Sequence, residues 1–145
     1  MVEFAMVIPI FMLVLSGILD FGFALFDRMT VINAAREGAR AAVMVSDTTT
    51  IPTVAQASAI AAATQPGINV NYLTVSTPKC IQGNLTTTSP CNFDHVHDAT
   101  HPNGAQTGDS VSVTVNYSYQ ISFPMLTLLG ITSFDLSSTV QMVIE

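Results

Sequence analysis

An apolar run near the start of the chain sets the strongest limit on its fold. Between Phe4 and Phe26 the only charged residue is Asp20. As a helix that rises 1.5 Å per residue, this run spans roughly 34 Å, which is enough to cross the hydrocarbon core of a bilayer. A cleavable secretory signal has a basic start, a shorter apolar core and a small-residue cleavage site, and the run shows none of these. The run therefore predicts a helix that lies in lipid or in a bundle of similar helices.

The helical pattern continues past the apolar run. Residues 27–45 are rich in helix formers, and no proline interrupts them before Pro52. We therefore expect one long helix from Glu3 to about Val45. This gives an N-terminal transmembrane and assembly segment, residues 1–46, followed by a second domain, residues 47–145.

Two residues inside the apolar run need a physical reason. Pro9 removes a backbone donor, and neighbouring helices in a bundle can tolerate the resulting kink. Asp20 places a carboxylate near the far end of the span. It can lie at the level of the lipid headgroups, or it can pair with a charge on a neighbouring subunit.

Small residues recur on the second half of the predicted helix. They are Ala34, Gly38 and Ala42 at four-residue spacing, with Ala35 and Ala39 beside them. Such spacing lets another helix approach closely and predicts a packing seam. Arg36, Glu37 and Arg40 lie on neighbouring faces, where they can form an ion pair or simply a solvated face.

Taken in order, these residues resemble the start of the TadE-like family of pseudopilins. The matching residues are Val2, Glu3, Phe4, Ala5, Pro9, Asp20, Phe21, Gly22 and residues 33–40. The resemblance covers about the first third of the chain. It implies a bitopic protein, processed by a prepilin peptidase, that works in the assembly of Tad or Flp pili for adhesion and surface colonisation. The expected partners are other pilin or pseudopilin subunits and the Tad inner-membrane assembly platform.

The resemblance also implies roles for individual residues. Glu3 looks like the pilin glutamate that pairs with the N-terminal amine of a neighbouring subunit, although it can also merely lie at the interface. The full set of predicted assembly residues is Glu3, Phe4, Pro9, Asp20, Ala34, Arg36, Glu37, Gly38 and Arg40. A cleavage glycine five residues before Glu3 would place a leader ahead of Met1. On the positive-inside rule alone, the arginines after the span would put the second domain in the cytoplasm, whereas a basic leader and the cysteines favour the outside. We expect a bacterial inner-membrane protein with an extracytoplasmic domain.

The two cysteines suggest a disulfide, and the net charge argues against one class of partner. Cys80 and Cys91 lie in a polar, threonine-rich stretch, and a disulfide between them is the simplest interpretation, with two reduced thiols as the alternative. The chain carries a net charge of −6. Nucleic acid is therefore not expected as a partner, because phosphate binding needs a basic face.

The second domain is predicted to be α+β and pilin-like. A short helix is expected from Ile51 to Gln65, with Pro52 in its first turn. Its cap would be Thr49 or Thr50, and its packing face Val54, Ala57 and Ala61. Strict alternation predicts a half-buried strand over residues 109–121. Further strands are expected around residues 68–75 and 136–144, which gives a small antiparallel sheet of three to four strands.

Two features of the second domain have open interpretations. The apolar stretch 123–131 can be a structural connection or a surface that docks on the bilayer or on a partner. All three histidines, His95, His97 and His101, lie near Asp94 and Asp98, and such residues can bind a metal. The alternative function is therefore a membrane-tethered metal-binding or hydrolytic domain, and a third possibility is a solitary binding module with no filament. Since no catalytic motif accompanies the histidines, we expect no enzyme activity and no cofactor.

Overall fold

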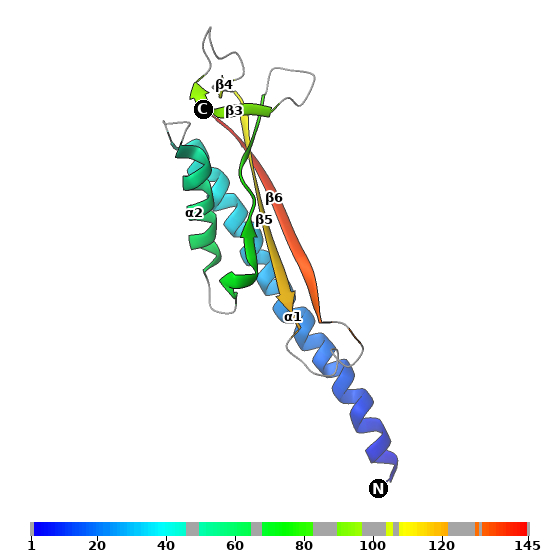
Figure 1. Ribbon diagram of the computed structural model, residues 1–145. Coiled ribbons are helices and arrows are strands. Elements are labelled where there is room, and N and C mark those ends of the chain that lie inside the picture. The colour runs from blue at the N-terminus through cyan, green and yellow to red at the C-terminus, as the bar shows by residue number, and fades with distance from the viewer. Residues whose placement is uncertain are drawn as a thin grey trace.

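The computed structural model describes residues 2–45, 50–64, 68–82, 90–96, 104–105, 108–121, 130 and 132–144. For residues 2, 3, 5, 90–96 and 104–105 the description covers the backbone alone. The described part has two layers, in which two helices pack on one face of a sheet (Figure 1). This arrangement confirms the predicted α+β class.

The longest element is helix α1, Val2–Val43, which runs through Pro9 without a break. It confirms the long helix expected from the sequence. Its second half lies along the sheet, whereas its N-terminal part extends well beyond the sheet (Figure 1). We call the sheet, the second half of α1 and the helix beside it the head.

The sheet is built around its longest internal strand. The strands are β1 (Leu73–Val75), β2 (Lys79–Ile81), β3 (Pro90–Val96), β4 (Gly104–Ala105), β5 (Ser110–Gln120) and β6 (Ser133–Val143). Strand β5 pairs antiparallel with β6 along its whole length, and β1 and β2 lie one after the other on its opposite edge. Strand β3 pairs antiparallel with β2, and β4 adds a short parallel pairing to β3. Strand β5 is therefore covered on both edges.

The three predicted strands differ in outcome. The alternating strand over residues 109–121 is confirmed as β5, and the last strand is confirmed as β6. The first strand was predicted too early, because residues Val70–Tyr72 form a 3-10 helix, η2, and β1 begins only at Leu73. The side chain of Asn69 accepts a hydrogen bond from the Asn71 amide at 3.0 Å. This local bond offers the backbone an alternative to strand pairing.

The core lies between β5 and α1. Val111, Val113 and Val115 on β5 are fully buried, and the polar residues between them on the strand lie on the other face. Each such side chain contributes roughly 1.5 to 3 kcal/mol when it leaves water. The alternation of β5 therefore fixes which face of the sheet receives the helices.

Helix α2, Ile51–Ala63, packs chiefly against α1. Thr50 holds the N-cap position and Pro52 lies in the first turn, as predicted, but the Thr50 side chain makes no capping hydrogen bond. The predicted packing face is wrong, since Ala57 and Ala61 are exposed and Val54 is half-buried. The buried residues are Ile51, Ala55, Ala59 and Ala63. Because alanine occupies six of the thirteen positions of this helix, on more than one face, its own pattern does not specify a packing face.

Candidate assembly surface and the cleft beside it

The first part of α1 carries an uninterrupted apolar surface. In residues 4–19, which we call the projecting segment, the exposed large side chains include Phe4, Met6, Ile10, Phe11 and Ile18. Phe4 is 76% exposed and Met6 is 73% exposed. Contiguous apolar surface of this extent marks contact with a membrane or with another protein. Among the described residues, one stretch, Met6–Val43, is long and apolar enough to cross a membrane.

One stripe of α1 is buried along the head. Its members recur every three or four residues, the spacing of a single helical face. They are Ser16, Asp20, Ala24, Asp27, Val31, Ala34, Gly38 and Ala42. The two carboxylates of the long helix that face the sheet therefore lie among small and apolar residues.

Asp20 contacts the end of β5. The hydroxyl of Tyr119 lies 3.4 Å from both the backbone carbonyl and the Oδ1 atom of Asp20, and it donates to them. Asp20 is 4% exposed, and so is Tyr119. Burial, followed by the nearby charge of Asp20, raises the pKa of Tyr119 to about 12. The sequence did not predict this contact, although the alternation of β5 does place Tyr119 on the buried face.

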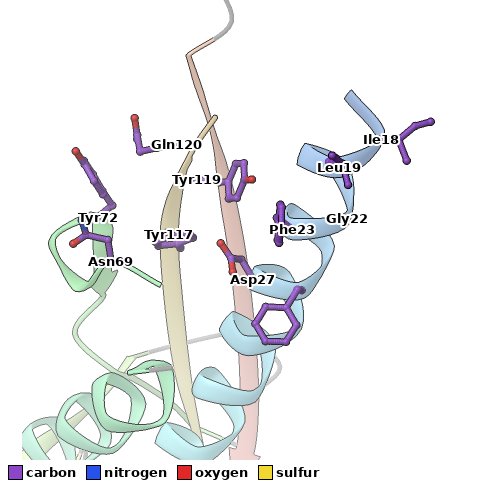
Figure 2. Close-up of a pocket in the computed structure, with 11 residues that line it drawn as sticks. Ile18, Leu19, Gly22, Phe23, Asp27, Asn69, Tyr72, Tyr117, Tyr119 and Gln120 are labelled. Atoms are coloured by element: carbon purple, nitrogen blue, oxygen red, sulfur yellow. The ribbon is translucent and has the colours of Figure 1, made fainter. Parts of the chain in front are cut away.

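A cleft of about 800 Å³ opens between α1, η2 and β5. From α1 it is lined by apolar residues and by Asp27, and from the other elements by three tyrosines, Tyr72, Tyr117 and Tyr119 (Figure 2). Asp27 is 5% exposed, and within the described part of the chain it has no hydrogen bond or ion pair. Burial raises the pKa of Tyr117.

The predicted packing seam is filled by the chain's own helix. Ala34 and Gly38 are buried where α1 meets α2 and β5. A Cβ atom on Gly38 would lie 2.9 Å from the carbonyl oxygen of Ala55 and 2.9 Å from the Cβ of Ala59. The close approach of α2 therefore depends on the absence of a side chain at this position.

The other predicted assembly residues fall in two places. Phe4 and Pro9 are exposed on the projecting segment, where the backbone of Glu3 also lies. Arg36, Glu37 and Arg40 are exposed on the head. Glu37 and Arg40 border a shallow hollow against α2. These residues are not brought together into one site.

The cysteines are brought together by the sheet. Cys80 on β2 and Cys91 on β3 are direct partners in the antiparallel register. Residues opposite each other in such a ladder have Cα atoms about 4.5 to 5.5 Å apart, a separation within the range that a disulfide spans. The backbone therefore has the geometry that the predicted bridge needs.

Most of the histidine cluster lies outside the described residues. His95 is on β3, where the backbone alone is described, and His97 and His101 fall outside the description. In the part of the chain that is described, no group of three potential metal ligands occurs. Of the apolar stretch 123–131, the description includes Gly130, whose φ of 81° is one that glycine readily adopts.

The comparisons with known proteins agree with the resemblance seen in the sequence. The model of the TadE-like protein family matches residues 1–40, which confirms the resemblance over that segment. No curated protein and no solved structure matches the chain.

Proposed function

We propose that the chain is a pilin-like subunit of a Tad-type pilus or secretion machine, and that it acts in filament assembly through packing of its long helix. The observation that carries this proposal is the division of α1 into an exposed apolar projecting segment and a half buried in the head. The TadE-like match covers both parts of the helix. A rod whose apolar side chains stay exposed beside the described part of its own chain needs lipid or sister rods around it.

The length of the rod supports a single membrane crossing. Residues 2–19 span about 27 Å as a helix, close to the roughly 30 Å of a hydrocarbon core. Buried Asp20 follows directly, so the head begins where the hydrocarbon would end. In this proposal the protein crosses the bacterial inner membrane once before it enters a filament.

The cysteines support a proposal for the side of the membrane on which the head lies. A Cys80–Cys91 bridge would form in an oxidising compartment, and the paired register of β2 and β3 favours such a bridge. The head is accordingly assigned to the extracytoplasmic side, where it can take part in adhesion. Its partners are other pilin or pseudopilin subunits and the inner-membrane assembly platform, and its role is structural rather than enzymatic.

The test replaces Glu3, the residue to which the family resemblance gives an assembly role. In cells, Glu3→Ala should abolish filament formation while the protein still accumulates in the membrane with a folded head. Filaments are counted by electron microscopy, and folding of the head is checked by its resistance to protease. Asp135→Ala is the control, because it removes an exposed carboxylate from the head, outside the long helix. Normal filaments in the Glu3→Ala strain would rule out the proposed role of Glu3.

A further inference from the structure

The described lining of the cleft between α1, η2 and β5 supplies no cation for the buried carboxylate of Asp27. Among the residues that the structure describes, no lysine, arginine or histidine lines it. Asp27 is 5% exposed there. A carboxylate removed from water is unfavourable unless a positive group or several donors compensate it. The cleft therefore has the chemistry of a site for a cationic group.

The remaining lining favours a cation that is flat and carries an apolar stem. Phe23 and Phe26 border the cleft from α1, and Tyr72 and Tyr117 border it from the head. Aromatic faces attract cations, and a guanidinium group stacks on them while it bonds a carboxylate through two nitrogens. An arginine side chain fits these requirements better than a lysine does.

The chain itself carries an arginine at nearly the same height along α1 as Asp27. Arg28 is exposed and directly follows Asp27. Along a helix the two residues differ in height by about 1.5 Å. Arg28 is also two residues beyond Phe26, a rotation of about 200°, so the guanidinium projects from the flank of the rod opposite the cleft. One copy therefore carries the cleft on one side and the arginine on the other.

We propose that the cleft of one copy receives Arg28 of a second copy, whose guanidinium pairs with Asp27. This inference rests on the proposed function, because membrane anchoring is what holds neighbouring rods parallel and at equal height. Under that condition Arg28 reaches the level of Asp27 with no axial shift, whereas Arg36 lies about 12 Å higher. The contact joins two different surfaces, so it can repeat from copy to copy into a row or ring.

The experiment measures self-association of the full-length chain in lipid vesicles. Two populations carry donor and acceptor dyes at the C-terminus, and energy transfer is followed as the protein-to-lipid ratio is lowered. Arg28→Glu should weaken association at least about tenfold, as expected when one member of a desolvated charge pair is lost. Lys79→Glu, the matched control with the same charge change at an exposed residue of the head, should change association less than about twofold.

Mixing two variants distinguishes the contact between Arg28 and Asp27 from a general effect of charge on association. Asp27→Asn and Arg28→Glu should each associate weakly alone, because every contact then lacks one partner. Mixed together, an Asp27→Asn copy still supplies Arg28 to the intact cleft of an Arg28→Glu copy, so energy transfer between the two variants should recover. Circular dichroism of each variant checks that the fold is retained.

Each contrary outcome has a distinct meaning. If the wild-type chain associates and Arg28→Glu behaves like Lys79→Glu, or if the mixture does not recover, this inference is overturned while the proposed function stands. If Asp27→Asn alters association only in vesicles that contain phosphatidylethanolamine and Arg28→Glu has no effect, the cleft binds a lipid ammonium and the inference is likewise overturned. A wild-type chain that stays monomeric at every ratio overturns the inference, and the Glu3→Ala strain then tests the proposed function separately.

Discussion

Gly38 offers the sharpest test of how the head is packed. It lies where α1 meets both α2 and β5, and a Cβ atom added there would meet three atoms within 3.2 Å. The nearest are the Ala55 carbonyl oxygen and the Ala59 Cβ, each at 2.9 Å, followed by Val113 Cγ1 at 3.2 Å. The first two belong to rigid parts of α2, so Gly38→Ala must push the helices apart.

The expected change in the free energy of unfolding for Gly38→Ala is the difference between two opposing effects. Alanine in place of glycine favours a helix by about 1 kcal/mol. Overpacking a well-filled core typically costs about 1 to 3 kcal/mol, and contacts below 3.0 Å to a backbone atom place Gly38 at the upper end. The net expectation is a destabilisation of about 2 kcal/mol, which lowers Tm by roughly 5 to 10 °C.

The assay is thermal unfolding of the full chain in detergent, followed by near-ultraviolet circular dichroism of the tyrosines. Gly22→Ala is the matched control, since it makes the same change in the same helix at a position where a Cβ meets nothing within 4 Å. It should leave Tm unchanged or raise it. If Gly38→Ala proves as stable as Gly22→Ala, then α2 does not pack at this distance and the account of the seam is refuted.

Two further predictions concern the side chains that join the elements of the head. Tyr119→Phe removes the hydroxyl that bonds Asp20 and should destabilise the head by about 1 kcal/mol at neutral pH, measured by chemical denaturation. The pKa of Tyr119 is about 12 in the fold, above its ordinary value near 10, so the fold favours the neutral phenol. The contribution of Tyr119 to the free energy of unfolding is therefore complete below about pH 10. It falls by at most about 3 kcal/mol as the pH rises toward 12. Tyr119→Phe should lack this alkaline loss, and identical pH profiles for the two proteins would contradict the assignment. Finally, Cys80 and Cys91 should not react with an alkylating agent, as detected by mass spectrometry, until a reductant opens the bridge between them. Reduction of this bridge should lower the free energy of unfolding by roughly 3 kcal/mol. Immediate alkylation of both thiols would show that no bridge forms.

Much of the architecture was predictable because the signals were strong and local. The long helix followed from an apolar run with good helix formers behind it, and β5 from strict alternation over residues 109–121. Both patterns arise from the repeat of a single element and need no knowledge of its neighbours. The start of β1 was missed, since Asn69 forms a turn whose energy competes with strand pairing.

The errors and omissions concern contacts between elements. The face of α2 could not be chosen from an alanine-rich sequence, whereas in the fold Gly38 admits Ala55 and Ala59. The contact between Asp20 and Tyr119 of the same chain was not predicted. The two residues are separated by 99 positions, so no local pattern could pair them.

The amino-acid sequence by itself determined that this protein carries an apolar rod, a short helix and alternating strands, because hydrophobic periodicity reports the surroundings of each element directly. Only the tertiary structure decided which side of the rod faces the head. That side holds Asp20, Asp27 and Gly38, residues whose burial depends on tyrosines and alanines brought in from distant parts of the chain. The hydrophobic pattern of one helix or strand indicates that one of its faces is buried. Which element covers that face is decided by the packing of all the helices and strands together.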